Sequence, residues 1–371
     1  GTLVGGRLRV GDDVRLLPSG VEAKVRGIQV HGDAVPEAVA GQRTAVNLGG
    51  IERAEAERGE VLVHVGTIEP TSLVDGIVRH LSVCRRPLKQ RARVLFHAGT
   101  TQVMGTVVLL EDRELAPGAH GPVQLHLESP VVTLPGDRFI LRGFEAQQNY
   151  GTTLGGGEVV RVRGPKLRRV DAEAAGLVRT LRNAEPDDRV ALEVQGAGLS
   201  GINRTELQGR LPFVPRALDR ALERLGSQGV LVRFDREQNA YAHRDVAADL
   251  RARIAAEVDR YHVEQPLRAG AGREEIRSKL PPGVPVKLFH LAVEQLAADG
   301  TLEVDRESLR RKGRRTQVAA EGLAPLKARV AEALRAGGLS PPRPAELEGD
   351  ASKVQDTLRL LDDSLPDGRE G

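Results

Sequence analysis

Two clusters of basic side chains are the most prominent chemical features of this sequence. The first cluster has five cations within nine residues and the second has six within ten: Arg85, Arg86, Lys89, Arg91 and Arg93, and then Arg306, Arg310, Arg311, Lys312, Arg314 and Arg315. Guanidinium groups grip phosphate through paired hydrogen bonds, so such clusters can hold the backbone of RNA or DNA. For either cluster taken alone, a solvated loop or strand face is an equally good interpretation.

Motifs for enzymatic chemistry are absent from the sequence. No Gly-x-x-x-x-Gly-Lys-Ser/Thr loop occurs, and the Gly155-Gly156-Gly157 run lacks a following lysine, which favours a turn or a strand end. No His-Glu-x-x-His occurs, and the nine histidines are scattered singly. The single cysteine, Cys84, excludes an intramolecular disulfide and a multi-cysteine zinc site. We therefore expect no catalytic residue and no metal ligand in this chain.

Composition narrows the classes of partner. The 371 residues include 54 Lys and Arg against 51 Asp and Glu, a formal net charge of +3. Aromatic residues make up only 2%, which leaves almost nothing on which bases could stack. No run approaches the ~20 apolar residues that a membrane span needs, so a transmembrane protein is excluded.

The expected secondary structure changes from strands to helices near residue 165, and these elements must position the basic clusters. The first ~165 residues contain short alternating runs, such as 61–65, 93–97 and 137–142, separated by Gly and Pro. Short strands at this spacing are typical of barrels and sandwiches, and the pattern breaks near 67–75. The sequence predicts two antiparallel β-barrels, at 1–67 and 68–165.

After Gly164-Pro165 the hydrophobic period becomes helical, and the sequence repeats itself loosely. Each repeat predicts a helix, a short helix, a longer helix and a β-hairpin, which is the order of a winged helix. The hairpins begin near Gly229 and Gly300. We expect winged helices at 168–244, 245–318 and 320–371, the third truncated, with a long helix at 245–263. The fold class is therefore mainly β in the N-terminal half, followed by α+β tandem winged helices.

The β half resembles domains 2 and 3 of translational GTPases of the elongation-factor-Tu type. Runs similar to their strands and strand ends lie at 1–12, 40–48, 58–60 and 135–142. Generic members of that superfamily end there, whereas this chain continues through 153–160 into winged helices. That order resembles the bacterial selenocysteine-specific elongation factors, known as SelB, and 338–347 is similar to the start of their third winged helix.

The resemblance implies a fragment of a factor that delivers selenocysteinyl-tRNA to the ribosome at recoded UGA codons. The β-barrels would bind aminoacyl-tRNA, and the winged helices would link it to the hairpin of a selenoprotein mRNA. The family's GTP-binding domain, which holds GTP and magnesium, is missing here, as are the opening strand of domain 2 and the last winged helix, the main hairpin reader. The resemblance thus implies a cytoplasmic monomer with no cofactor in this chain, and leaves open whether the chain counts as an enzyme.

The resemblance also implies where the selenocysteinyl group binds. In the family, a basic residue of the 40–48 strand lines that pocket, and this position is Arg43 here, with His31 on the neighbouring loop as a second candidate. A selenol ionises well below neutral pH, so a guanidinium can distinguish its anion from the neutral hydroxyl of serine. Without the resemblance, Arg43 would be interpreted as a surface strand residue.

Two other function classes remain open. Another translational GTPase would share the barrels, although the winged helices count against it. A DNA-binding regulator would need recognition helices rich in Arg, Asn and Gln; Arg220 and Arg224 satisfy this in the first repeat, whereas the second offers only Gln295. We expect the first two winged helices to act as spacers.

Overall fold

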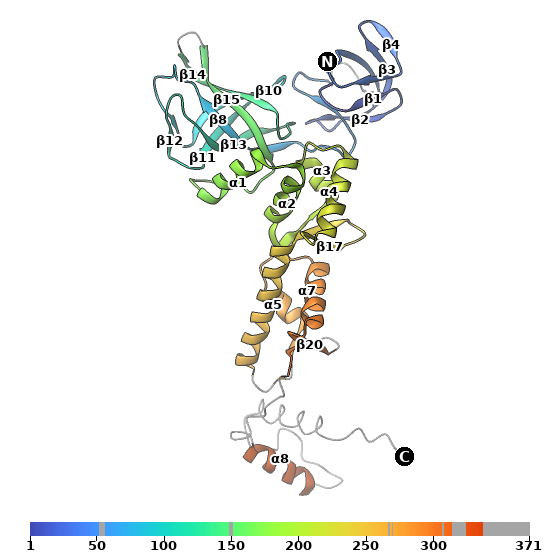
Figure 1. Ribbon diagram of the computed structural model, residues 1–371, viewed down its shortest axis with the longest axis vertical. Helices are drawn as coiled ribbons and strands as arrows, with labels where there is room; N and C mark the ends of the chain where they lie inside the picture. The colour runs from blue at the N-terminus through green and yellow to red at the C-terminus, as the bar shows by residue number, and fades with distance from the viewer. Residues whose placement is uncertain are drawn as a thin grey trace. The chain divides into compact units, whose positions relative to one another are not determined.

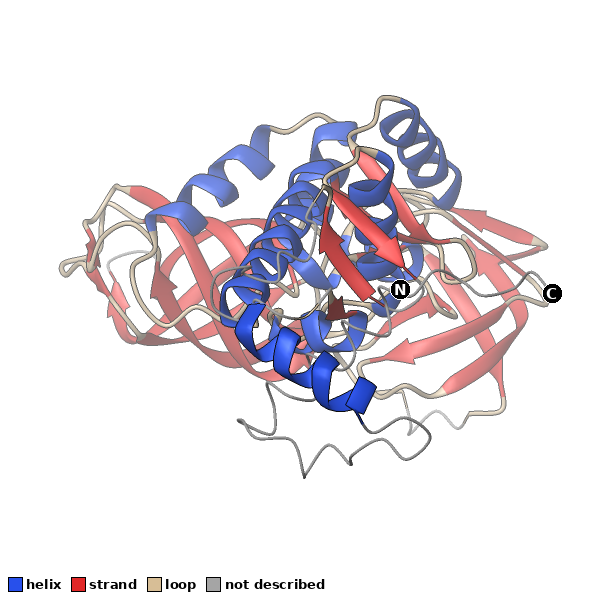
Figure 2. Cartoon of the chain, turned by 90° about the horizontal axis from the view of Figure 1, so that it is seen from below, coloured by secondary structure: helices blue, strands red, loops and turns tan. Residues whose placement is uncertain are grey.

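The computed structural model describes residues 1–51, 56–147, 151–265, 268, 270–305, 308–313 and 324–336 (Figure 1). The chain divides into two compact units, Gly1–His243 and Arg244–Gly371, and each is described by itself. No helix occurs among the described residues that precede Ala172. Figure 2 distinguishes the helices, in blue, from the strands, in red. None of the described helices is both long and apolar enough to cross a membrane.

The first β unit surrounds a small aliphatic core. Its strands are β1 (Arg7–Arg9), β2 (Asp13–Leu17), β3 (Glu22–Val30), β4 (Asp33–Val35), β5 (Glu37–Val39), β6 (Thr44–Gly49) and β7 (Val61–His64). Within each strand, buried residues alternate with more exposed ones, as a period of two predicts. Leu8 of β1, Val14 of β2 and Val25 of β3 are among the buried residues that form the core. Strands β4, β3, β2 and β7 form a sheet that β6 joins at β3, whereas β1 and β5 form a separate ribbon. Among the described residues, strand pairing therefore does not run continuously around this unit as it would in a closed barrel.

The second β unit is a closed antiparallel barrel, as the sequence predicted. Its strands are β8 (Thr71–His80), β9 (Leu88–Lys89), β10 (Ala92–Ala98), β11 (Thr101–Leu109), β12 (Glu114–Leu115), β13 (His120–Val131), β14 (Arg138–Gln147) and β15 (Gly151–Val162). Hydrogen bonds connect six of them in the order β10-β11-β13-β8-β15-β14 and back to β10, whereas β9 and β12 pair with each other. The core is aliphatic except for the rings of Phe96 and Phe139, whose centroids are 5.3 Å apart.

The three consecutive glycines lie inside β15, which corrects the expectation of a turn or a strand end. A Cβ at Gly156 would lie 2.6 Å from the carbonyl oxygen of Phe139. At Gly155 and Gly157 it would clash with the carbonyl oxygens of Arg79 and Ile77 on β8. The glycines are required because neighbouring backbones approach closely where the barrel closes.

Helix α1 (Ala172–Asn183) packs on the outside of the second barrel. The Asp171 side chain caps it by accepting a 3.0 Å hydrogen bond from the N–H of Ala174. The buried face of the helix shares one apolar cluster with barrel residues that include Ile77 and Val108. This segment is therefore anchored to the barrel.

The first winged helix has the order of elements that the sequence predicted. It contains α2 (Pro186–Gly196), a 3-10 turn (Gly198–Ser200), β16 (Ile202–Asn203), α3 (Arg204–Arg210), α4 (Pro215–Ser227), β17 (Leu231–Asp235) and β18 (Ala240–His243). Leu218, Leu222 and Leu225 lie on one face of α4 and are buried in the core of this domain. The three strands pair in the order β16-β18-β17 and form the wing.

The second winged helix repeats this plan. It contains α5 (Arg244–Glu264), β19 (Ala271–Gly272), α6 (Arg273–Lys279), α7 (Val286–Ala298), β20 (Leu302–Asp305) and β21 (Ser308–Arg311). Helix α5 closely matches the predicted 245–263 and buries a stripe that includes Leu250, Ile254 and Val258. Of the proposed third winged helix at 320–371, only α8 (Ala324–Ala336) belongs to the described residues.

Candidate functional site

Arg43 and His31 flank the last residue pair of two neighbouring strands, at one end of the first β unit. Val30, the last residue of β3, pairs with Thr44, the first residue of β6. His31 follows that pair and Arg43 precedes it, so the two strands bring them to the same edge. The backbone of Arg43 forms an isolated antiparallel bridge with Thr2, whereas its side chain is exposed and has no hydrogen bond or ion pair with any described residue. Arg43 is thus a fixed cation that remains available to a ligand.

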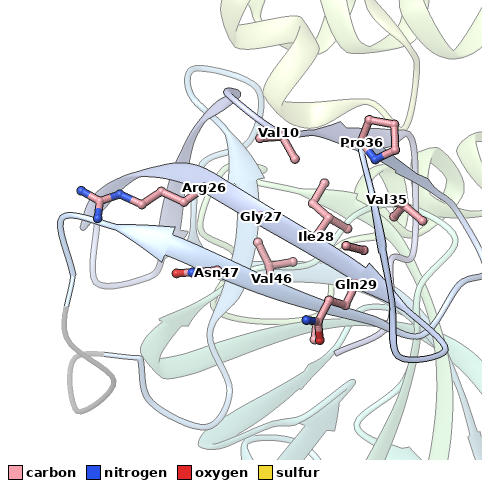
Figure 3. A pocket seen from close by; sticks show the side chains of 11 residues that line it. Val10, Arg26, Gly27, Ile28, Gln29, Val35, Pro36, Val46 and Asn47 are labelled. Atoms are coloured by element: carbon pink, nitrogen blue, oxygen red, sulfur yellow. The ribbon is translucent and has the colours of Figure 1, made fainter.

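A pocket of about 600 Å³ opens on the same two strands. Its lining comes from β3, β6, the segment that carries β4, and Val10: Val10, Arg26, Gly27, Ile28, Gln29, Ala34, Val35, Pro36, Ala45, Val46 and Asn47. Figure 3 shows Arg26 and Asn47 at one end of this pocket and Val35 and Pro36 at the other. It therefore combines an aliphatic surface with amide and guanidinium groups, a mixture that suits a small polar ligand with one flat apolar face.

Arg43 shares one exposed strand face with part of the pocket lining. Along β6, exposed residues alternate with less exposed ones, so Arg43, Ala45 and Asn47 face outward together. At about 3.3 Å per residue, Arg43 lies ~13 Å along the strand from Asn47. A ligand lying along this face could contact Ala45 and Asn47 and present an anionic end to Arg43.

The first basic cluster is largely neutralised by acids from other strands. Salt bridges join Arg86 to Glu145 at 3.3 Å, Lys89 to Glu114 at 3.9 Å and Arg93 to Glu128 at 2.5 Å. Only two of its cations, Arg85 and Arg91, have no side-chain partner among the described residues. Three of the five cations of this cluster are therefore paired with acids.

A buried histidine holds the loop that contains this cluster. The ring nitrogens of His80 lie 2.9 Å from the carbonyl oxygen of Leu154 and 3.0 Å from that of Arg86. The Cys84 thiol lies 3.5 Å from the same Leu154 oxygen, and burial raises its pKa above the usual range. This makes Cys84 a structural residue and a poor nucleophile.

The second basic cluster lies on the wing of the second winged helix, where the sequence placed it, but two of its described cations are paired with acids. Arg310 pairs with Glu303 at 2.9 Å across the hairpin, and Arg311 makes two hydrogen bonds, of 2.7 and 2.6 Å, to Asp259 on α5. Lys312 lies against Gly300, where an added Cβ would be 2.9 Å from Nζ. The remaining predicted members, Arg306, Arg314 and Arg315, lie outside the described residues.

Sequence reasoning overlooked a third basic group, between the second barrel and α1. Residues 161–169 carry five cations and no acid, which is the signal that could have revealed it. Lys166, Arg168 and Arg169 are exposed and have no side-chain partner among the described residues. Arg91 belongs with them, because Lys166 and Arg91 both lower the pKa of His126, although burial of that imidazole is the larger cause.

A buried polar network lies directly beneath this group. The Gln124 amide donates hydrogen bonds to the Asp75 carboxyl at 2.8 Å and to the carbonyl of Pro165 at 2.9 Å. Its oxygen accepts hydrogen bonds from the N–H of Leu167 at 2.7 Å and from the His126 ring at 2.8 Å. Burial raises the pKa of Asp75 to about 6, despite the opposing hydrogen bond from Gln124. The network ties the connecting segment to the barrel.

The described residues do not fit the GTP and magnesium that the resemblance implies for the missing domain. No phosphate-binding Gly-x-x-x-x-Gly-Lys-Ser/Thr loop occurs in the sequence. No group of three or more His, Cys, Asp or Glu side chains among the described residues is arranged to hold a metal ion. The strand face around Arg43 and the exposed cations are thus the features that can bind a ligand.

Comparison with known families accounts for most of the folded segments. Residues 1–63 match the model of elongation factor Tu domain 2. Residues 76–166 match the β-barrel domain of selenocysteine-specific elongation factor, and residues 255–310 match the winged helix of elongation factor SelB. These matches follow one another in the order that the structure gives to its two β units and second winged helix.

Curated relatives and a solved structure extend over nearly the whole chain. The selenocysteine-specific elongation factor of Desulfomicrobium baculatum is 33% identical over 361 residues, which is 97% of this chain and 56% of that protein. The proteins of that name from Escherichia coli and Haemophilus influenzae are 26% and 22% identical over 81% and 82% of the chain, and 45% and 47% of their own lengths. The chain thus spans about half the length of these relatives.

A crystal structure of a bacterial selenocysteine-specific elongation factor, EF-Sec, has the same fold. It matches with a TM-score of 0.58 and 19% sequence identity, over 96% of this chain and 52% of that one. The domain matches, the related sequences and this shared fold agree with one another. The chain belongs to the selenocysteine-specific elongation factor (SelB) family.

Proposed function

We propose that the first β unit binds the aminoacylated end of selenocysteinyl-tRNA, and that the protein delivers this tRNA to the ribosome at recoded UGA codons. The observation that carries the proposal is the exposed strand face on which Arg43 lies with two residues of the pocket lining, Ala45 and Asn47. The terminal nucleoside offers a flat ring and polar edges, which suit the mixed lining of the pocket. The aminoacyl group would then extend along β6 toward Arg43.

The charge of the side chain supplies the selectivity. Selenocysteinyl-tRNA and seryl-tRNA carry similar small side chains, but the selenol is ionised near neutral pH and the hydroxyl is not. An exposed guanidinium without a carboxylate partner attracts the anion and gains nothing from the neutral group. His31, at the edge beside Arg43, can donate a further hydrogen bond.

The winged helices connect this tRNA-binding part to the selenoprotein mRNA hairpin. The first two winged helices bury their apolar faces within their own domains, and the wing cations Arg310 and Arg311 are held by acids. This arrangement favours a spacer over a sequence reader. Hairpin recognition, GTP binding and magnesium binding are assigned to parts of the family's architecture outside this chain, and the site of action is the cytoplasm.

The experiment that tests the proposal compares two tRNAs on one variant. Arg43→Ala, in the protein as its gene encodes it, should weaken binding of selenocysteinyl-tRNA by roughly one to two powers of ten, the value of a charge-assisted contact. Binding of seryl-tRNA should stay nearly unchanged. Arg7→Ala is the control, because Arg7 is also an exposed arginine of this unit but is paired with Glu37. An equal loss on both tRNAs would refute the assignment of Arg43 as the selenolate reader.

A further inference from the structure

The segment 163–170, which connects β15 to α1, is held in one backbone conformation. Its first residue, Arg163, donates its N–H to the carbonyl of Leu73 at 3.1 Å, and Asp171, just beyond it, donates to Leu110 at 2.8 Å. In between, Gln124 accepts from the N–H of Leu167 and donates to the carbonyl of Pro165. A backbone fixed at both ends and in the middle displays its side chains with little entropy left to lose on binding.

This connector displays cations that the protein does not neutralise. We define the connector cluster as Arg91, Lys166, Arg168 and Arg169. All four are exposed, and none has a side-chain hydrogen bond or ion pair with another described residue. Exposed arginines elsewhere in this unit are commonly paired, as in Arg179 with Glu111 at 2.6 Å and Arg224 with Asp187 at 2.6 Å. The cluster is therefore an excess of positive charge that an external polyanion can compensate.

His126 lies between the two parts of the cluster. It is partly buried on β13, its Nε2 lies 2.8 Å from the Gln124 oxygen, and both Arg91 and Lys166 act on it electrostatically. The imidazole also has a backbone hydrogen bond with Leu167 of the connector. This places Arg91, from the turn before β10, and Lys166, from the connector, around one point on the surface.

We infer that the connector cluster binds the phosphodiester backbone of RNA, at a surface separate from the strand face around Arg43. Unpaired cations on a rigidly held backbone suit successive phosphates, whereas the near absence of exposed aromatic side chains disfavours stacking of bases. The contacts should therefore be independent of sequence and sensitive to salt. The choice of RNA over DNA rests on the proposed function.

The test measures binding of the 371-residue chain to deacylated tRNA and to a mixed-sequence double-stranded RNA across a salt series. Arg168→Gln combined with Arg169→Gln should weaken binding about tenfold at 0.1 M salt. It should also reduce the slope of log K against log salt by about 1.5, the value for two lost phosphate contacts. Arg168→Lys with Arg169→Lys keeps the charge and should keep most of the slope, which excludes misfolding as the cause.

The matched control is Arg216→Gln with Arg220→Gln on the exposed face of α4, because it removes the same charge from unpaired arginines elsewhere in the same unit. If the connector variant loses affinity for both RNAs, the cluster is a general site for the RNA backbone. If it loses affinity for tRNA alone, tRNA is the source of the phosphates. Unchanged affinity and slope, or an equal loss in the α4 control, overturns the inference. Arg43→Ala should not alter binding of deacylated tRNA, so this result is independent of the test of the proposed function.

Discussion

Arg161 and Glu193 form an ion pair that is almost completely removed from solvent. The Nε atom of Arg161 lies 3.2 Å from Oε1 of Glu193, and the two side chains are only 4% and 3% exposed. Arg161 belongs to the last strand of the second barrel and Glu193 to the first helix of the first winged helix. Burial raises the pKa of Glu193, although the positive charge of Arg161 opposes this.

Loss of one partner of this pair should be costly. Glu193→Ala removes the carboxylate that pairs with the buried Arg161 guanidinium and leaves only Asp75 to act on it electrostatically. We therefore expect the free energy of unfolding to fall by about 3–5 kcal/mol. Urea denaturation followed by circular dichroism measures this. Glu111→Ala, which breaks the exposed pair with Arg179, should cost no more than about 1 kcal/mol. Similar losses in the two variants would contradict our account of the buried pair.

The raised pKa of Asp75 should make the folded protein more stable at mildly acidic pH than at neutral pH. Its folded pKa of about 6 lies above the ordinary value of 3.8, so the folded state holds the proton more tightly than the unfolded chain does. This contribution, about 3 kcal/mol, is fully present below the unfolded pKa and is lost as the pH rises through 6. Asp75→Asn should abolish this trend, so the difference in unfolding free energy between parent and variant should change between pH 4 and 6.5.

Asp187→Asn provides a control in which the contribution to stability should depend on pH in the opposite direction. The hydrogen bond from Arg224 lowers the pKa of Asp187, so its contribution is present above the unfolded pKa and is lost as the pH falls. A pH profile for Asp75→Asn that parallels the parent profile would show that Asp75 is not the titrating group.

Gly157→Ala should disrupt the second barrel. Its Cβ would collide with the carbonyl oxygen of Ile77 and lie 2.8 Å from the Phe139 ring, and the backbone atom cannot move without breaking strand pairing. We expect a loss of roughly 3 kcal/mol. Gly176→Ala on α1 has open space around the new methyl group and should stabilise the protein by about 0.5–1 kcal/mol. Thermal unfolding of both variants checks this, and a stable Gly157→Ala protein would refute it.

Arg43→Lys should retain part of the preference for the selenocysteinyl form. The ammonium preserves the charge but not the planar fork, so its loss of affinity should be smaller than that of Arg43→Ala. The measured quantity is the ratio of affinities for selenocysteinyl-tRNA and seryl-tRNA. A lysine variant that behaves like the alanine variant would mean that guanidinium geometry, not charge, provides the selectivity.

Local patterns in the sequence predicted the elements well, because strands and helices bury alternate residues or stripes. The long helix was expected at 245–263 and extends from Arg244 to Glu264. Relations between distant segments escaped prediction. Glu114, Glu128 and Glu145 neutralise the first basic cluster only because strand pairing brings them there.

The candidate site also has a part that the sequence predicted and a part that it did not. Arg43 and His31 could be named from the sequence by resemblance, and the register of β3 and β6 brings them together at one edge. Whether they read the selenocysteinyl group stays a prediction. The connector cluster was overlooked because its significance depends on missing counter-charges, which only the folded arrangement reveals. The glycines of β15 were misassigned because close backbone approach leaves no local sequence signal other than glycine itself.

The Arg161–Glu193 pair also affects whether the second barrel and the first winged helix unfold together on heating. Helix α1 completes an apolar cluster on the barrel, and Arg189 of α2 donates a 3.0 Å hydrogen bond to the carbonyl of Val160 on β15. The barrel cannot lose β15 without exposing this helical segment, and the helices cannot detach without exposing a charge. We therefore expect the second barrel and the first winged helix to melt as one calorimetric transition, with an enthalpy that matches their combined size.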